Sequence, residues 1–409
     1  MVRINLNYLR LPPSYLFSEI ARRAREFQAA NPGVQLMRLG IGNTTEPLAP
    51  AVIEGLHHGV DRLARVETYS GYGDEQGDAR LRERIAEVKY RARGLDIAAD
   101  EIFISDGAKP DTANIQTMFD PDALVAFQDP AYPVYVDTNV IAGRGGATVG
   151  DGLFERFEYM AGTEQNGFVP DVPSRHVDLI YLCSPNNPTG AVATHAQLAR
   201  FVEYALAHDA IIIFDAAYEI FIRDPSLPRS IYELPGARRC AVELCTFSKE
   251  AGFTGVRLGW TVVPKGLAID EQNPRSLNEL WNRRTTTFFN GASNVVQEGG
   301  LAILTPEGQR QNREIIDLYM RNAATIRAGL RALGLTVYGG ENAPYVWVKC
   351  PPGLTSWDFF DKLLREARVI TTPGAGFGPH GEGFLRLSAF GHGENIRAAV
   401  DSIRRNLRL

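Results

Sequence analysis

Five short loops in this sequence concentrate polar residues suited to ligand binding and proton transfer. Each follows an apolar run, and the five read Ser105-Asp-Gly-Ala-Lys109, Asp129-Pro-Ala-Tyr132, Ser184-Pro-Asn-Asn-Pro-Thr-Gly190, Asp215-Ala-Ala-Tyr218 and Thr246-Phe-Ser-Lys249. In an open α/β sheet, ligands bind beyond the carboxyl ends of the strands. The five loops could therefore serve an anion, a pyridinium ring and a carbonyl group at one site.

Lys249 has the most distinctive chemistry of these residues, because lysine is scarce in this chain. Of 43 basic residues, six are lysines, at positions 89, 109, 249, 265, 349 and 362. A lysine amine forms a Schiff base with an aldehyde and, once displaced by substrate, is free to move a proton. Burial should lower the pKa of this amine. Lys249 is therefore a candidate tether and base.

Each motif taken alone also has a purely structural interpretation. The Asn-Asn-Pro-Thr-Gly segment could be a turn, Asp215 a helix cap and Lys249 a solvated lysine; Arg257 could form a surface ion pair. The order distinguishes the set: an Asn loop, an Asp and then a Lys at successive strand ends, and an Arg eight residues after the Lys. This series resembles the fold-type I pyridoxal-phosphate aminotransferases, which use SPNNPTG, DAAY and SK-x7-R in this order to hold their cofactor.

The resemblance implies pyridoxal 5′-phosphate as cofactor, and elementary chemistry matches residues to its parts. Asp215 would keep the pyridine nitrogen protonated, and Tyr218 would hydrogen-bond the ring hydroxyl oxygen. The phosphate needs helix N-terminal N–H groups with hydroxyl and guanidinium donors. The predicted cofactor-binding residues are Tyr72, Ala108, Lys109, Tyr132, Asn187, Asp215, Tyr218, Thr246, Ser248, Lys249 and Arg257, and the predicted catalytic ones are Lys249, Asp215 and Tyr218.

Several of these roles come from the family alone. The family places an aromatic ring over the pyridine, which falls on Tyr132, and a contact from Asn187 to the ring oxygen and the substrate. Tyr72 would reach the phosphate from a partner subunit. Arg386 matches the arginine that holds the substrate α-carboxylate with its fork. Tyr132 could instead be a core residue, and Arg386 a charge on a strand face.

A finer resemblance, to the LL-diaminopimelate aminotransferases of plants and some bacteria, runs along almost the whole chain. It rests on the segments 71–77, 105–109, 253–260 and 289–293. It implies transamination between LL-2,6-diaminopimelate and 2-oxoglutarate, forming tetrahydrodipicolinate, glutamate and water, with the reverse direction serving lysine biosynthesis. The distal ammonium and carboxylate of this substrate need their own partners.

By this resemblance Glu75, Lys109 and Asn290 serve that distal end, while Tyr15 and Gly42 close over the ligand. Several of them should come from the neighbouring subunit of a homodimer with shared active sites. The full predicted substrate-binding set is Tyr15, Gly42, Glu75, Lys109, Tyr132, Asn187, Asn290 and Arg386.

Two residues depart from the family pattern. Asp74 stands where proline is expected in YGPEQG, and Glu250 follows the lysine where an uncharged residue is expected. We expect the Glu250 carboxylate to point to solvent, although a carboxylate at this position could instead alter the pKa of Lys249.

Three alternative functions remain open at this point. A plant relative with the same cofactor motifs acts on lysine, and Glu75 and Asn290 favour diaminopimelate only modestly. A carbon–sulfur lyase or cyclopropane-forming synthase of this fold would use the same lysine on a substrate with a leaving group. A ligand-sensing domain of a transcription regulator would need a DNA-binding module, and the residues before Leu39 contain no basic helix-turn-helix.

The elements that position these loops are predicted from hydrophobic patterns. Short apolar runs alternate with amphipathic stretches, which indicates a mostly parallel sheet covered by helices on both faces. Residues 194–208 should form a helix that begins with a Thr194–Gln197 capping box. The predicted strands are 101–105, 123–127, 179–183, 210–214 and 241–245.

The pattern changes after residue 301 to a long Arg-rich helix, strands at 345–349 and 384–389, and a helix at 356–367. The fold class implied is an α/β fold-type I transferase with a smaller α+β domain. We expect residues 1–45 to pack on the small domain and partner subunit, 46–300 to form the cofactor-binding domain, and 301–409 the small domain.

Composition limits the partners. A net charge of -5 and a pI near 5.9 argue against a nucleic-acid or membrane surface and favour small-molecule amino and keto dicarboxylic acids. The four cysteines show no metal-ligand spacing, so we expect buried free thiols and no metal. Apolar runs are too short to span a membrane, and the first ten residues lack a signal-peptide core, so we expect a cytoplasmic protein.

Overall fold

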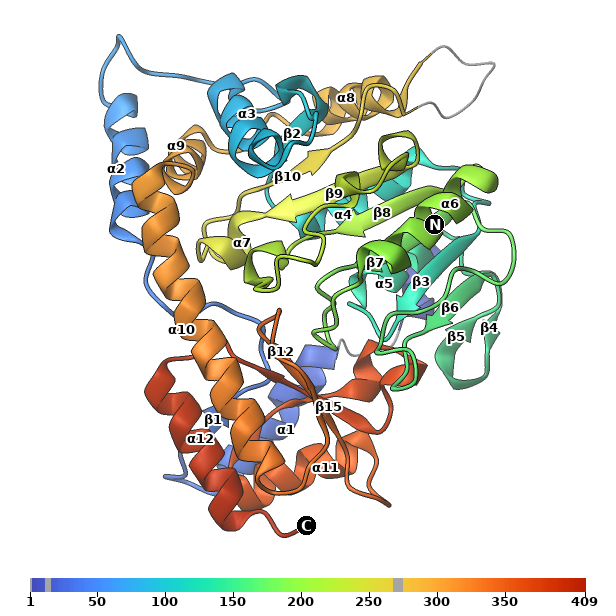
Figure 1. Ribbon diagram of the computed structural model, residues 1–409, viewed down its shortest axis with the longest axis vertical. Coiled ribbons are helices and arrows are strands. Elements are labelled where there is room, and N and C mark those ends of the chain that lie inside the picture. The colour runs from blue at the N-terminus through green and yellow to red at the C-terminus, as the bar shows by residue number, and fades with distance from the viewer. Residues whose placement is uncertain (1, 12–15, 268–274) are drawn as a thin grey trace.

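The computed structural model describes residues 2–11, 16–267 and 275–409, and a seven-stranded sheet lies at the centre of its larger part (Figure 1). The strand order is β2-β10-β9-β8-β7-β3-β6, with β10 antiparallel to both neighbours and the other pairs parallel. The bounds are β2 Ile102–Ser105, β3 Val125–Asp129, β6 Phe157–Ala161, β7 Leu179–Cys183, β8 Ile211–Asp215, β9 Ala241–Thr246 and β10 Gly259–Val262. All five predicted strands are present, whereas β6 and β10 were not predicted. The mostly parallel α/β class is confirmed.

Helices cover both faces of this sheet, because its strands are apolar on both sides. One face packs on α2, α3, α6 and α9, and the other on α4, α5, α8 and the first half of α10. The bounds are α2 Pro50–Leu63, α3 Ala79–Ile85, α4 Ala108–Ile115, α5 Val134–Ile141, α6 His195–Ala207, α7 Phe247–Glu250, α8 Leu277–Phe288, α9 Asn294–Ile303 and α10 Pro306–Arg331.

Helix α6 forms as its sequence predicts. The Thr194 hydroxyl accepts from the Gln197 N–H at 3.2 Å, and the Gln197 carboxamide accepts from the Thr194 N–H at 3.0 Å. The capping box supplies partners to N–H groups that a helix start leaves free. Leu198, Phe201 and Val202 are buried against the sheet.

The smaller part lies below the larger one in Figure 1 and is joined to it by the 26-residue helix α10. Its antiparallel sheet has the order β11-β12-β15-β14, and β1 pairs in parallel with β13 beside it. The bounds are β1 Met37–Arg38, β11 Val337–Gly339, β12 Tyr345–Lys349, β13 Val369–Ile370, β14 Thr372–Pro373, β15 Phe384–Ser388, α1 Leu16–Ala30, α11 Ser356–Lys362 and α12 Gly393–Asn406. The predicted smaller α+β unit is therefore present.

Helix α10 contributes to both hydrophobic cores. Ile316 and Tyr319 pack in the core of the large sheet, whereas Ala323 and Ile326 pack in the core of the smaller part. The division at residue 300 stays a prediction, with α10 as the connection. The N-terminal residues contact both parts of the structure. The Asn5 Nδ2 donates to the Ile141 carbonyl of α5 at 2.9 Å, whereas α1 packs on the small sheet.

Three further expectations concern the chain as a whole. Within the described residues, no helix is both long and apolar enough to cross a bilayer. All four cysteines are buried free thiols, as predicted. Among the same residues, no three His, Cys, Asp or Glu side chains gather in a way that could hold a metal ion.

Candidate active site

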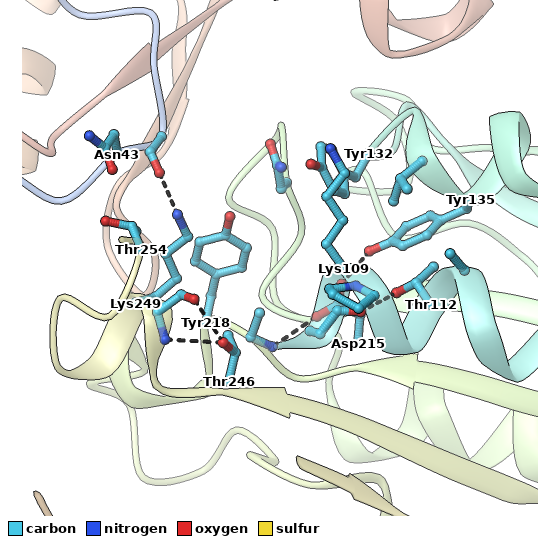
Figure 2. Close-up of a pocket in the computed structure, with 18 of the residues that line it drawn as sticks. Asn43, Lys109, Thr112, Tyr132, Tyr135, Asp215, Tyr218, Thr246, Lys249 and Thr254 are labelled. Carbon is cyan, nitrogen blue, oxygen red and sulfur yellow. Dashed lines mark hydrogen bonds between the residues drawn. The ribbon is translucent and has the colours of Figure 1, made fainter. Parts of the chain in front are cut away.

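A cavity of about 760 Å³ opens between the carboxyl ends of the large-sheet strands and the smaller part (Figure 2). The loops after β7, β8 and β9 reach it together with α4, α5 and the 41–43 segment, as expected for parallel strands that end at one edge. Twelve predicted site residues line it: Gly42, Ala108, Lys109, Tyr132, Asn187, Asp215, Tyr218, Thr246, Ser248, Lys249, Arg257 and Arg386.

Lys249 lies on the one-turn helix α7, whose N-terminus is capped by Thr246. Its Nζ extends into the cavity and donates to the Gly42 carbonyl oxygen, a contact that Figure 2 draws as a dashed line. Burial and the nearby Arg386 and Arg257 lower its pKa from 10.5 to about 8, against the opposing effect of Asp215. At pH 7 about a tenth of this amine is therefore unprotonated, far more than for an ordinary lysine, and the unprotonated form is the one that a nucleophile or base requires.

Asp215 ends β8 on the floor of the cavity. One carboxylate oxygen accepts from the Tyr135 hydroxyl at 2.6 Å and the other from the Ala217 N–H at 2.9 Å. Burial raises the pKa of Asp215 despite these donors and Lys249. A protonated ring nitrogen is the partner that would favour the ionised carboxylate here. Tyr135 was not predicted as a site residue. It lies on α5, three residues after Tyr132, which is in the loop before that helix.

The opposite wall carries a buried arginine. Arg386 donates from Nη1 to the Asn187 Oδ1 and from Nη2 to the Gly40 carbonyl, both at 2.6 Å, and its Nε has no partner among the described residues. The Tyr345 ring lies 4.6 Å from the guanidinium carbon. A buried guanidinium facing a cavity fits a planar carboxylate.

Tyr345 also joins this wall to the floor, because its hydroxyl lies 2.8 Å from that of Tyr218. Tyr345 was predicted as the start of a strand and not as a site residue. Nothing in the local sequence shows that strand β12 faces the loop after β8.

An anion cradle lies at the N-terminus of α4. The N-cap is Gly107, which has no side chain to satisfy the first N–H groups of the helix. The Arg257 Nη1 donates to the Ser248 hydroxyl at 3.1 Å, and the Thr246 hydroxyl lies 3.0 Å from that of Ser248. A Cβ on Gly107 would lie 2.6 Å from the Arg257 Nη2, so glycine permits this approach. Helix N–H groups, hydroxyls and a guanidinium form a donor set for phosphate.

Other predicted residues lie elsewhere. Tyr72 is 88% exposed, Asn290 is exposed, and Glu75 is half-buried, all outside the cavity. Glu75 and Asn290 belong to adjoining segments, since a Cβ on Gly291 would meet the Glu75 Cα at 3.7 Å. Tyr15 lies outside the described residues. Whether a second subunit brings Tyr72, Glu75 and Asn290 to the cavity stays a prediction.

The expectation that Glu250 points to solvent is wrong. Glu250 is 7% exposed, and its carboxylate accepts from the Lys89 Nζ at 2.6 Å. It points away from the cavity because it follows Lys249 on a single helical turn, where neighbouring side chains diverge. Asp74 replaces the expected proline as a turn residue: its Oδ1 accepts from the Gln76 N–H at 2.9 Å.

The donor set of the cavity matches pyridoxal 5′-phosphate in each part, with a phosphate cradle, a buried carboxylate for the ring nitrogen and an amine of lowered pKa for the aldehyde. Comparison with known proteins also indicates an enzyme that uses this cofactor. The family model for aminotransferase class I and II matches residues 34–403.

Three solved structures illustrate the likeness. The L,L-diaminopimelate aminotransferase from Chlamydomonas reinhardtii is 49% identical, with 98% of each chain covered and a TM-score of 0.93. Substrate-bound BacF from Bacillus subtilis is 26% identical, covering 99% of this chain and 98% of BacF with a TM-score of 0.82. A double mutant of aspartate aminotransferase from Thermus thermophilus, 23% identical over 99% of this chain and 100% of its own, shares the fold with a TM-score of 0.83. The chain belongs to the class I and II aminotransferases, enzymes that depend on pyridoxal 5′-phosphate.

Proposed function

We propose that this enzyme transfers an amino group between LL-2,6-diaminopimelate and 2-oxoglutarate, and that in the biosynthetic direction it forms LL-diaminopimelate on the route to lysine. The observation that carries the proposal is the 49% identity, over 98% of both chains, to an enzyme solved as an L,L-diaminopimelate aminotransferase. The neighbours at 26% and 23% identity support the fold without distinguishing substrates, and the family model supports the general reaction.

Bound pyridoxal 5′-phosphate supplies an electron sink for the substrate carbanion. Lys249 then removes and returns the substrate Cα proton through its Nζ, whose pKa of about 8 leaves it able to accept a proton near neutral pH. Asp215, oriented by Tyr135, holds a proton on the ring nitrogen. Tyr218, held by the Tyr345 hydroxyl at 2.8 Å, donates toward the ring oxygen.

Other residues of the chain orient the ligands. The α4 N-terminus, Ser248 and Arg257 hold the phosphate. Arg386 and Asn187 hold the substrate α-carboxylate, since their hydrogen bond places both donors at one wall. The Tyr132 ring would cover the cofactor. The Lys109 Nζ, 5.8 Å from the centroid of that ring, would bind the distal carboxylate of the substrate.

We further propose a homodimer in which Tyr72, Glu75 and Asn290 complete the site of the partner subunit. The segment around Tyr72 supports this, because Val66, Tyr69 and Tyr72 are 93%, 65% and 88% exposed. Exposed apolar side chains gathered in this way mark interaction surfaces. We also propose that the chain from about residue 301 onward forms a separate, smaller C-terminal domain. The proposed location is the cytoplasm.

A panel of amino donors tests the substrate. Purified enzyme should be yellow and convert LL-diaminopimelate with 2-oxoglutarate to glutamate, whereas meso-diaminopimelate and lysine should be poor donors. Equal rates with lysine and with LL-diaminopimelate as amino donor would contradict the substrate assignment. Release of a small leaving group from a sulfur amino acid would favour a lyase. As control, Lys249→Ala should retain cofactor noncovalently and lose turnover.

Mixing subunits tests the dimer. Lys249→Ala and Glu75→Ala should each be inactive on diaminopimelate, while their mixture should recover about a quarter of parental activity, since half the dimers are mixed and carry one intact site. No recovery after verified exchange of subunits would contradict shared sites.

A further inference from the structure

Lys89 is a buried lysine with no place in the reaction described so far. It lies on the π-helical turn η2 (Ala86–Tyr90), which follows α3, and is 6% exposed. Its Nζ donates to the Glu250 carboxylate at 2.6 Å and to the Glu219 carboxylate at 3.1 Å. Burying an ammonium is costly unless it is paired, and π-helical turns occur frequently at functional sites.

The two carboxylates that hold Lys89 immediately follow two residues of the cavity. Glu250 follows Lys249 on α7, and Glu219 follows Tyr218 at the start of the 3-10 turn Glu219–Phe221. Both elements are single turns, which have few backbone hydrogen bonds of their own to fix their positions. One ammonium therefore joins the two short segments from which Lys249 and Tyr218 project.

The charges of Lys89 and Glu219 persist across a wide pH range. Arg93 lies 3.1 Å from the Glu219 carboxylate and Arg229 lies 3.6 Å from it. Burial would raise the pKa of Glu219, but Lys89, Arg93 and Arg229 outweigh it and lower this pKa to about 2. Burial lowers the pKa of Lys89, but Glu250 and Glu219 outweigh burial and raise it. The contact between Lys89 and Glu219 is thus a fixed ion pair. Burial raises the pKa of Glu250, although Lys89 opposes this shift.

No charge of this cluster is among the causes that shift the pKa of Lys249. Burial of the amine, together with Arg386 and Arg257, lowers the pKa of Lys249, and Asp215 raises it. The Glu250 carboxylate is turned toward Lys89, on the side of α7 away from the cavity.

We propose that Lys89 is a positioning residue for transamination: through Glu250 and Glu219 it sets where Lys249 and Tyr218 stand relative to the cofactor and to each other. The inference rests on the roles proposed above for Lys249 and Tyr218. A proton transfer needs donor and acceptor within hydrogen-bond reach, and a displacement of about 1 Å can cost a hundredfold in rate.

Three variants separate positioning from simple stability. Lys89→Met leaves Glu250 buried without its cation and should destabilise the protein. Lys89→Met with Glu250→Gln removes that unpaired charge, so the double variant should fold with an unfolding midpoint near the parental one. Lys89→Arg keeps a cation for both carboxylates. The matched control is Lys265→Met, which removes a half-exposed lysine paired with Asp100 at the surface.

Each variant is measured in two ways besides its unfolding midpoint. The first is kcat and KM on the best amino donor of the parent, so that the outcome does not depend on diaminopimelate being the substrate. The second is the pH titration of the visible absorbance of the resting holoenzyme, which reports the environment of the lysine that holds the cofactor.

The double variant should lose kcat by between about tenfold and a hundredfold while KM changes little. The midpoint of its absorbance titration should move by about half a pH unit or more. Lys89→Arg should restore most of kcat, and the Lys265→Met control should match the parent. A folded double variant with parental kcat and titration would overturn the proposal. If the double variant does not fold, Glu250→Ala, which leaves Lys89 paired with Glu219, should show the same shift and a smaller loss, and parental values there would also overturn it.

Discussion

Replacement of Lys249 by methionine should make the apoprotein more stable at neutral pH. Its pKa is lowered from 10.5 to about 8, because the folded state buries the ammonium near two arginines. At about 1.4 kcal/mol for each pKa unit, this drop represents about 3 kcal/mol by which folding is disfavoured when the lysine is protonated. Methionine has a similar length but carries no charge. It also loses the hydrogen bond to the Gly42 carbonyl, at a cost of about 1 kcal/mol. The net expected gain is about 2 kcal/mol.

The pH dependence follows from the direction of the shift. Between pH 8 and 10.5 the unfolded state binds a proton at Lys249 that the folded state does not, so the stability of the parent rises with pH in this window. Below pH 8 both states are protonated and the full cost applies. Near pH 10.5 and above, both are neutral and the cost disappears. The advantage of Lys249→Met should therefore be constant below pH 7 and fall below about 1 kcal/mol at pH 9.5.

Urea unfolding of cofactor-free protein at pH 7 and pH 9.5, followed by tryptophan fluorescence, measures both values. Lys265→Met, on the surface, controls for the loss of a lysine elsewhere. Two results would contradict this prediction: Lys249→Met is no more stable than the parent at pH 7, or its advantage is the same at both pH values. In either case Lys249 is not held at a lowered pKa by its surroundings.

Three further substitutions test other parts of the site. Arg386→Lys, which replaces a fork with a single ammonium, should lower kcat/KM for the amino donor by about tenfold or more, and an unchanged value would remove Arg386 from the carboxylate site. Gly107→Ala places a Cβ 2.6 Å from the Arg257 Nη2 at a φ of +124°, so titration of the apoprotein with pyridoxal 5′-phosphate should show about tenfold weaker binding; parental affinity would refute the tight cradle. Tyr135→Phe removes the 2.6 Å hydrogen bond to Asp215 and should raise the pKa of that carboxyl further, so that cofactor affinity falls and falls more steeply as pH decreases; an affinity profile identical to the parent would show that Tyr135 does not support Asp215.

Local patterns in the sequence were sufficient for much of the fold and for the cofactor side of the cavity. Strand β8 is predicted because four apolar residues, Ile211 to Phe214, precede Asp215, and a strand buried on both faces requires this pattern. Helix α6 is predicted because its cap and its apolar stripe lie within fifteen residues of one another. Asp215, Lys249 and Asn187 come together because parallel strands end at one edge, so the position of a residue after its strand also gives its place in space.

Contacts between distant segments were decided by tertiary packing alone. The hydroxyl of Tyr345 meets that of Tyr218, and the carbonyl of Gly42 meets Lys249, only because the smaller part folds against the large sheet. Lys89 and Glu250 are 161 positions apart, and no local pattern links them. The prediction for Glu250 was wrong for this reason: a sequence shows that a carboxylate adjoins a lysine, but not which side chain from another element neutralises it. Local sequence patterns determine which residues lie at the edge of the sheet. The packing of separate helices and strands determines which of those residues contact one another.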